Sequence, residues 1–194
     1  MKTEPVDPEV LVTPVVALHS TTPTYDARWL VWKALQYSGN ILEIGCHHGE
    51  MTREFAMLYP TRHVWTVDWI ENNTIPEFQR PEILPSDKVN EHARYMPNVN
   101  LLLVNSRELD YDQLPGLSFV YIDGDHGYEG VKADSEKVLA YFAKNPKAAR
   151  PACVVWHDYC LTGWTEGVGK YLDSRTDLDL VRVDGSTIVY LEIE

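Results

Sequence analysis

Short apolar runs alternate with amphipathic stretches along most of the chain. The apolar runs are rich in β-branched and aromatic residues and predict seven strands, at residues 41–44, 64–67, 100–104, 117–122, 152–156, 178–183 and 187–193. Apolar positions at helical spacing predict helices at residues 25–37, 50–59, 86–96, 128–142 and 165–172. Strands that alternate with helices are typical of an α/β protein with a mostly parallel sheet, and the last two strands predict an antiparallel C-terminal hairpin.

The chain of 194 residues is long enough for one buried core and too short for two ordinary domains. We expect a single domain at residues 25–194, preceded by an arm at residues 1–24 whose four prolines prevent a continuous helix. The polar stretch after residue 68 is too long for an ordinary loop between a strand and a helix, which predicts a lid insertion at about residues 69–97. An apolar patch at residues 10–18 leaves two hypotheses, packing on the body or contact with a second copy in a homodimer.

The net charge of −12 opposes binding to a phosphate backbone, so we expect no nucleic-acid partner. Three cysteines without framework spacing favour free thiols in a reducing cytosol. No apolar run approaches the roughly 18 residues of a membrane span, and the amino terminus lacks the basic start and apolar core of an export signal. These features predict a cytoplasmic protein with no membrane partner.

A turn with two glycines, Gly45 and Gly49, follows the first predicted strand within the sequence ILEIGCHHGE. Gly45 lets a ligand approach the backbone, and the helix that begins after the turn presents free N–H groups. A dinucleotide-binding turn needs a further glycine between these two, and here the acid Glu43 precedes the turn. An anion at this place opposes a pyrophosphate and suits a cationic amino acid group, which disfavours a nicotinamide dehydrogenase. The alternative interpretation is a turn that only reverses the chain, with His47 and His48 facing solvent or lying beside the helix cap.

Polar residues follow the next two predicted strands. Asp68 ends the second strand, where an acidic side chain can accept both hydroxyls of a ribose; the alternative is a surface residue or helix cap. Trp69 follows it and is expected to contact an adenine or the lid. Asn105 and Ser106 follow the third strand, where they either lie near the adenine or cap a turn and helix.

The segments LEIGCHHGE and VDW resemble the first two motifs of class I S-adenosylmethionine (SAM) dependent methyltransferases, and the resemblance covers roughly residues 25–194. Within that class, FVYIDGDHGYEGVKAD followed by VVWHDY is similar to the small metal-linked O-methyltransferases of the cephalosporin-hydroxylase and macrolide-sugar methyltransferase group. The resemblance implies a Rossmann-like, doubly wound, mostly parallel seven-stranded sheet. The residues expected to bind SAM are Glu43, Gly45, Cys46, Gly49, Asp68, Trp69, Asn105, Ser106 and Asp123.

Asp123 and Asp158 follow two strands that should be neighbours, and the resemblance places both at a metal and acceptor site. Two carboxylates this close need a cation, and their hard oxygens favour Mg²⁺, Mn²⁺ or Ca²⁺. His157 completes the expected metal set. It stands where the metal-linked relatives often carry an acid or an amide, and strand alternation predicts that it points away from Asp158.

His126, three residues after Asp123, is the expected general base, since an ordinary histidine pKa near 6.5 suits proton transfer at neutral pH. Asp123 and His126 are thus the expected catalytic pair, although IDGDHGYEG also has the composition of an ordinary turn. The sequence favours O-methylation of a small hydroxylated acceptor, such as a natural-product sugar, assisted by Mg²⁺ or Mn²⁺. Two alternatives stay open: a metal-free N- or C-methyltransferase and a noncatalytic SAM-binding subunit.

Overall fold

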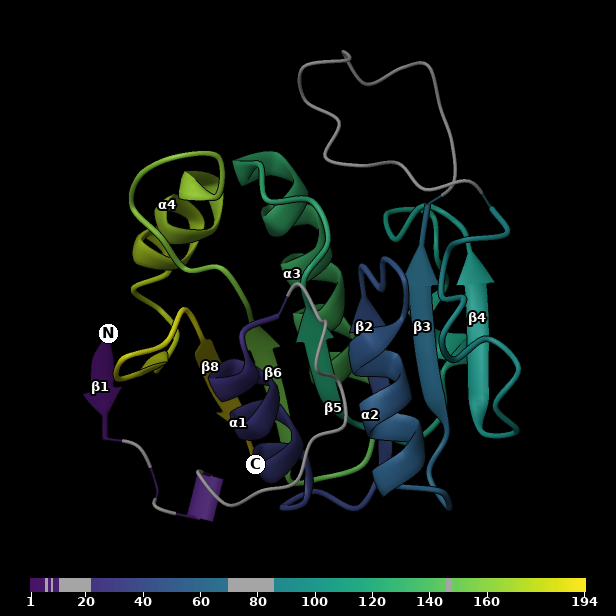
Figure 1. Cartoon of the computed structure of the whole chain (residues 1–194). Coiled ribbons are helices and arrows are strands. Elements are labelled where there is room, and N and C mark those ends of the chain that lie inside the picture. The colour runs from purple at the N-terminus through teal and green to yellow at the C-terminus, as the bar shows by residue number, and fades with distance from the viewer. Residues whose placement is uncertain (6, 8, 11–21, 70–85, 146–147) are drawn as a thin grey trace.

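The computed structural model describes residues 1–5, 7, 9–10, 22–69, 86–145 and 148–194. These residues form one eight-stranded sheet in the order β1-β7-β8-β6-β5-β2-β3-β4 (Figure 1). The strands are β1 (Lys2–Glu4), β2 (Asn40–Ile44), β3 (Val64–Asp68), β4 (Val99–Leu103), β5 (Leu117–Ile122), β6 (Ala152–Trp156), β7 (Val181–Val183) and β8 (Val189–Ile193). Among them β8 alone is antiparallel to its neighbours, β6 and β7. The predicted α/β class, the mostly parallel sheet and the C-terminal hairpin are confirmed, with eight strands in place of seven.

The strand that the prediction missed is β1, at the edge of the sheet. It pairs in parallel with β7, in a register that joins Lys2 to Val181 and Glu4 to Val183. Its residues are polar and mostly exposed, so no alternation of apolar positions marks the strand in the sequence. Backbone pairing and a hydrogen bond from the Tyr190 hydroxyl to Glu4 Oε2 (2.6 Å) hold it in place. The first residues of the expected arm therefore extend the sheet.

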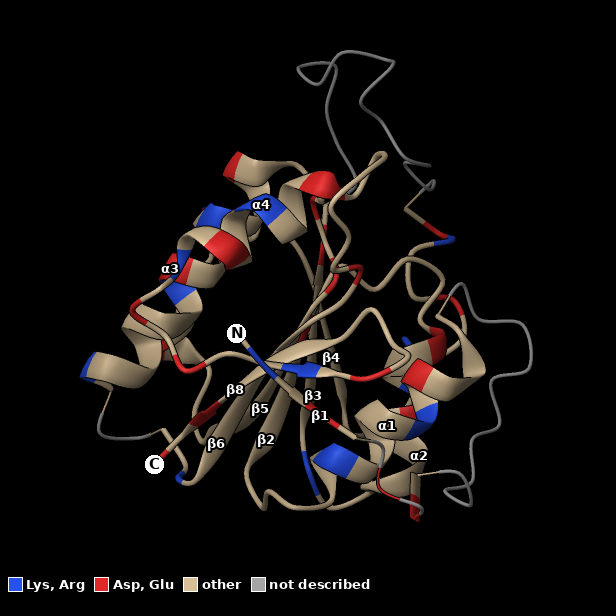
Figure 2. Cartoon of the chain, turned by 90° about the vertical axis from the view of Figure 1, so that its left-hand side faces the viewer, with Lys and Arg blue, Asp and Glu red and all other residues tan. Residues whose placement is uncertain are grey.

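The helices are α1 (Thr24–Ala34), α2 (Glu50–Leu58), α3 (Tyr128–Lys144) and α4 (Glu166–Ser174), with a short 3₁₀ helix η3 (Tyr111–Gln113). Helices α1 and α2 cover one face of the sheet, and α3 and α4 cover the other (Figure 2). The period-2 alternation of β5 follows this division, since Phe119 and Tyr121 pack with α1 and α2 while Val120 and Ile122 pack with α3 and α4. The result is the doubly wound, three-layer arrangement that the sequence predicts.

The helix predicted at residues 86–96 is absent, and this segment forms a series of turns. Asn90 has a φ of 53°, in the left-handed region that interrupts a helix. The N–H of Asn90 donates to the carbonyl of His47 (2.7 Å), and that of His92 donates to the carbonyl of His48 (3.0 Å). The helix prediction was wrong because these N–H groups bind the glycine turn instead of carbonyls within their own segment.

Two expectations fall largely outside the described residues. Residues 70–85 of the expected lid and residues 11–18 of the expected apolar patch belong to this part of the chain. Val10, the first residue of that patch, is fully buried in the core beside α1 and α2. The lid and the homodimer therefore stay predictions.

Lys and Arg are interspersed with Asp and Glu along α3 and α4 (Figure 2). Within the part of the chain that the structure describes, no helix has the length and apolar character needed to cross a membrane. The expectations of a cytoplasmic location and of no nucleic-acid partner stay predictions.

Strands β2 and β5 lie side by side at the centre of the sheet although β3 and β4 separate them in the sequence. The chain runs from β2 outward to β3 and β4, then returns to β5 on the other side of β2. In open α/β sheets, ligands bind outside the carboxyl ends of the strands at such a reversal of strand order. The residues directly after β2 and β5 are therefore the first place to look for a site.

Candidate active site

The glycine turn after β2 lies directly against the end of β5. The N–H of Gly45 donates to the carbonyl of Val67 (2.8 Å), and the N–H of Asp123 donates to the carbonyl of Ile44 (2.8 Å), so pairing continues past the strand ends. Gly45 has a φ of +86°, and a Cβ on it would lie 2.2 Å from the carbonyl oxygen of Asp123. Only glycine fits here, because both the backbone conformation and the contact exclude a side chain.

Asp68, the predicted ribose ligand, holds the glycine turn. Its Oδ2 accepts hydrogen bonds from the N–H groups of Cys46 (2.9 Å) and His47 (2.8 Å). Its Oδ1 accepts one from the N–H of the partly exposed Trp69 (2.7 Å). A carboxylate has about four acceptor positions, so Asp68 keeps capacity for ligand hydroxyls while it orders the turn.

Glu43 lies beneath the turn and is 1% exposed. Strand alternation points it toward α2, and the hydroxyls of Thr52 on α2 and Thr66 on β3 donate to its Oε2. Burial raises the pKa of Glu43 to about 8. The protein encloses this carboxyl, and its expected contact with SAM stays a prediction.

The Glu43→Gln substitution should reveal this buried acid through the pH dependence of stability. The folded-state pKa lies above the ordinary 4.5, so the protonated acid stabilises the fold fully at low pH, and the contribution is lost as pH rises toward 8. Glutamine mimics the protonated acid at every pH. At roughly 1.4 kcal/mol per pKa unit, the variant should gain a few kcal/mol over the wild type between about pH 5 and pH 8.5. Urea unfolding at about pH 5 and about pH 8.5 gives the difference in unfolding free energy between the two proteins. The same difference at both pH values would contradict the prediction.

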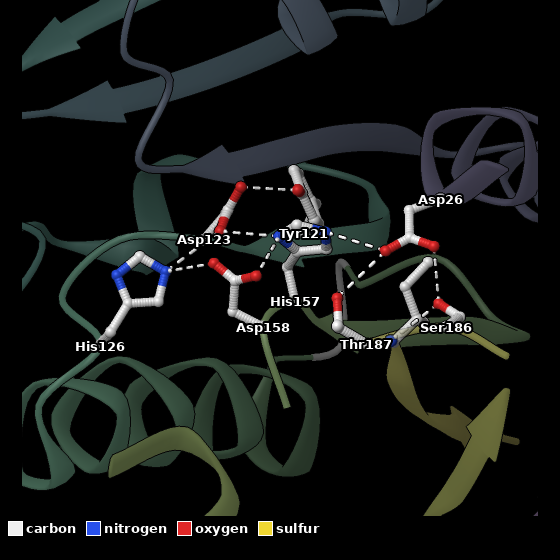
Figure 3. A network of polar contacts seen from close by, with 9 residues as sticks. Asp26, Tyr121, Asp123, His126, His157, Asp158, Ser186 and Thr187 are labelled. Carbon is white, nitrogen blue, oxygen red and sulfur yellow. Dashed lines mark hydrogen bonds and ion pairs between the residues drawn. The ribbon is translucent and has the colours of Figure 1, made fainter. Parts of the chain in front are cut away.

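Two acids and two histidines gather after β5 and β6 and form the acid–histidine cluster, which consists of Asp123, His126, His157 and Asp158 (Figure 3). His157 Nδ1 lies 3.3 Å from Asp123 Oδ1 and 3.4 Å from Asp158 Oδ1. His126 Nε2 lies 3.4 Å from Asp123 Oδ1 and 3.1 Å from Asp158 Oδ2. The expected catalytic pair and the expected metal ligands therefore converge at one place, beside Gly45.

The orientation of His157 differs from the prediction. Strand alternation would point it away from Asp158, but the regular strand ends at Trp156. Asp158 then takes a φ of 58°, a left-handed conformation that is uncommon for aspartate. Its side chain consequently lies on the same side as His157, and the prediction was wrong because alternation stops where the strand stops.

Three residues far from the motifs support the cluster, and the sequence analysis missed them. Asp26 of α1 is 3% exposed and its Oδ2 lies 3.1 Å from His157 Nε2. Ser186 (2.8 Å) and Thr187 (3.0 Å) donate hydrogen bonds to Asp26. Asp26 has no local signal, since it is an ordinary-looking acid in the first turn of a helix, 131 residues before its partner.

The second carboxylate oxygen of Asp123 is also held in place by a hydrogen bond. The hydroxyl of Tyr121 donates to Asp123 Oδ2 at 2.6 Å, which leaves Oδ1 facing the histidines. Tyr121 itself is completely buried, and its place on β5 reads as an ordinary core position. A buried tyrosine hydroxyl usually has such a partner, but the sequence does not say which.

The charges of the cluster shift its proton equilibria. Burial alone would lower the pKa values of His126 and His157, but Asp123 and Asp158 raise both, that of His126 to about 9. Burial alone would raise the pKa values of the two acids, but the histidines hold both below the ordinary range. The acids therefore favour a protonated imidazole at His126.

The cluster fits a divalent metal ion. Asp123, His157 and Asp158 each offer one ligand atom, and these atoms lie within 4.8 Å of one another. Asp26 accepts at His157 Nε2 when that nitrogen carries the proton, which leaves the Nδ1 lone pair facing the acids. This carboxylate–histidine arrangement commonly orients a metal-binding imidazole. Two carboxylate oxygens and one imidazole nitrogen suit Mn²⁺ better than Mg²⁺, since Mg²⁺ prefers oxygen ligands.

Asn105 and Ser106, which follow β4 after Val104, have local partners. Asn105 Oδ1 accepts from the N–H of Arg107 (3.0 Å), and the Ser106 hydroxyl donates to Asp134 Oδ1 (2.6 Å). These contacts match the turn-capping interpretation, and a contact with adenine stays a prediction. Asp125 bonds to Arg107 (2.9 Å) and to the N–H of Gly127 (2.8 Å), away from the acid–histidine cluster.

An exposed tryptophan borders the cluster. Trp164 is 69% exposed, and its ring centroid lies 4.6 Å from that of His126 in an edge-on arrangement. Tryptophan combines a large apolar ring with an N–H donor, which suits it to contact a ligand that is partly apolar and partly polar. Trp164 is therefore a candidate platform for a ligand that approaches His126.

Several methyltransferases are among the solved structures that share this fold. The calicheamicin methyltransferase CalS11 is 16% identical, with a TM-score of 0.60 over 86% of this chain and 77% of that one. PaMTH1 of Podospora anserina, solved with S-adenosylhomocysteine (SAH), is 12% identical, with a TM-score of 0.63 over 97% and 89%. An O-methyltransferase of Bacillus cereus, also with SAH, is 16% identical, with a TM-score of 0.58 over 96% and 89%. At these identities the likeness shows the fold, and it confirms the Rossmann-like prediction.

The sequence itself matches a family described as a methyltransferase domain over residues 42–159. This range begins in β2 and ends just past Asp158, so it contains both the glycine turn and the acid–histidine cluster. The chain belongs to the methyltransferase-domain family, and the predicted class of enzyme is confirmed. A search of curated proteins found no match.

Proposed function

We propose that the protein transfers a methyl group from SAM to a hydroxyl of a small molecule, with a divalent ion held by Asp123, His157 and Asp158. One observation carries this proposal: the two acids, His157 and His126 converge beside a glycine turn at the reversal of strand order. A site that only bound SAM would need the turn and Asp68. The acid–histidine cluster adds the groups that activate an acceptor.

The glycine turn and Asp68 form the cofactor side of the site. Asp68 keeps acceptor capacity for ribose hydroxyls, and the turn brings the Gly45 backbone against the Asp123 carbonyl. The cofactor side and the acid–histidine cluster are therefore in direct contact. SAM carries a methyl group on a sulfonium sulfur. An acceptor oxygen attacks the carbon of this methyl group, the carbon–sulfur bond breaks, and the electron pair of that bond stays on sulfur.

His126 is the proposed base for the acceptor hydroxyl. Its Nε2 faces Asp123 and Asp158, whose charges raise the pKa of the imidazole; a divalent ion bound to these acids would offset that charge, lower the pKa and leave the imidazole free to take a proton. Asp158, 3.1 Å away, and Asp123 then stabilise the imidazolium that forms. A bound divalent ion supplies Lewis acidity that lowers the pKa of the hydroxyl.

The acceptor class is a hydroxylated small molecule, such as a sugar or another natural product. CalS11, whose fold this chain shares, is described as a TDP-rhamnose 3'-O-methyltransferase. The exposed ring of Trp164 beside His126 offers the kind of flat apolar surface on which a sugar or an aromatic ring packs.

Replacing Trp164 with alanine should raise the KM for the acceptor while leaving kcat within about twofold. A lost aromatic contact is worth about 0.5–1.5 kcal/mol, which corresponds to an increase of roughly 2- to 12-fold. Trp164→Phe keeps a ring and should retain most of the affinity. Steady-state kinetics on the three proteins measures the effect, and equal KM values would remove Trp164 from the acceptor site.

The reaction type is tested with SAM that carries a labelled methyl group and matched pairs of acceptors that differ only in a hydroxyl or an amine. The proposal predicts label on the hydroxyl compounds, as a methyl ether by mass spectrometry. Label on the amines alone would favour the alternative of N-methylation. Binding of SAM without transfer to any acceptor would favour the noncatalytic alternative.

A further inference from the structure

A second group of metal-binding side chains lies on the other side of the glycine turn. We propose that His48, Glu91 and His92 bind a Zn²⁺ ion that fastens the segment at residues 86–97 to this turn. His48 belongs to the turn itself, and the other two residues belong to the segment where a helix was expected. The site shares no residue with the acid–histidine cluster.

The three side chains already face one another. Their ligand atoms lie within 4.8 Å of one another, and His48 Nδ1 is 2.8 Å from Glu91 Oε1. The ring centroids of His48 and His92 are 6.0 Å apart. A tetrahedral zinc ion with bonds of about 2.0–2.1 Å places its ligands roughly 3.4 Å apart, so small rotations of these side chains complete the site. They are 28–42% exposed, so an ion reaches them from solvent.

Backbone contacts hold the two segments together before any ion binds. The hydrogen bonds from Asn90 N–H to His47 and from His92 N–H to His48 set their register. Gly49 lies so close to Asn90 that a Cβ there would be 2.0 Å from Asn90 Oδ1. Because the ligands come from segments fixed in this way, little conformational freedom is lost on binding.

The donor chemistry selects zinc over magnesium. Two imidazoles and a carboxylate are a common ligand set for Zn²⁺, whereas Mg²⁺ takes oxygen ligands. Lys88 donates a hydrogen bond to Glu91 Oε2 (2.7 Å), so Oε1, which faces His48, is the oxygen turned toward the ion. Glu50, whose Oε1 lies 3.8 Å from His92 Nε2, offers a fourth ligand.

The test is a titration of the full-length, chelator-stripped protein with Zn²⁺ against a chromophoric competitor, without SAM. His92→Asn and Glu91→Gln remove proposed ligands. His63→Asn is the matched control, because His63 is an exposed histidine that precedes β3, at the opposite end of the sheet. Any zinc bound at the acid–histidine cluster is common to all four proteins, so the difference between them isolates the second site.

We expect the wild type and His63→Asn to bind one more equivalent of Zn²⁺ than His92→Asn, and Glu91→Gln to bind that equivalent at least about tenfold more weakly. Thermal unfolding should show a zinc-dependent rise in Tm for the wild type and the control that is lost in His92→Asn. If His92→Asn takes up as much Zn²⁺ as the wild type with the same affinity, the site does not exist. This outcome leaves the proposed methyl transfer untouched, since no methyl transfer is measured.

Discussion

The His126→Ala variant is expected to turn over about 10²–10⁴-fold more slowly than the wild type, because a positioned base contributes that much to a proton transfer. The imidazole lies within 3.4 Å of both acids of the cluster, and its nitrogens have no well-oriented partner within the described residues. Its loss should leave SAH affinity within about threefold, since the proposed cofactor side of the site consists of the glycine turn and Asp68. Single-turnover kinetics and SAH titration measure the two quantities separately.

The matched control for His126 is Asp125→Asn. Asp125 precedes the base in the same loop but pairs with Arg107 and the Gly127 N–H. The kcat of the Asp125→Asn variant should therefore stay near that of the wild type. If His126→Ala kept a wild-type kcat, another group would have to take the acceptor proton. If kcat fell equally in both variants, disruption of the loop would explain the loss better than removal of a base.

Removal of the proposed divalent ion should have the second large effect. Chelation is expected to lower activity at least about 100-fold, and Mn²⁺ should restore it at lower concentration than Mg²⁺, because His157 adds a nitrogen ligand. Asp158→Asn should weaken Mn²⁺ at least about 100-fold. Asp26→Asn, which weakens the contact that orients His157 and keeps both acids of the cluster, should weaken Mn²⁺ binding roughly 10- to 100-fold.

Activity against Mn²⁺ concentration, measured in a metal-buffered assay, gives these affinities. Full activity in chelator would reject the metal and favour the metal-free alternative with His126 as base. An unchanged Mn²⁺ requirement in Asp26→Asn would show that the Asp26–His157 contact has no part in metal binding.

The layers of the fold were predictable because burial leaves a mark at every core position. The buried strands β5 and β6 are apolar on both faces, and their predicted bounds match the structure. Strand β1 left no such mark, since an edge strand of polar residues is held by its backbone. The segment at residues 86–96 has the composition of a helix, but hydrogen bonds to the glycine turn override that local preference.

The candidate site was predictable where it follows strand ends. Asp123, His126 and Asp158 come together because parallel strands place their carboxyl ends at one edge of the sheet. The contribution of Asp26 depends on how α1 packs over the sheet, and no local pattern encodes that contact. The turn of Asp158 toward His157 depends on one left-handed residue, which neither strand period nor composition reveals.

The glycine turn and Asp68 are proposed to bind the cofactor of methyl transfer, and calorimetric titration of the protein with SAH measures this binding. We expect micromolar binding by the wild type and a loss of affinity of about tenfold or more in Asp68→Ala, because charge-assisted hydrogen bonds of about 1.5–3 kcal/mol are removed. Absence of SAH binding by the folded wild-type protein, with and without Mn²⁺, would contradict it.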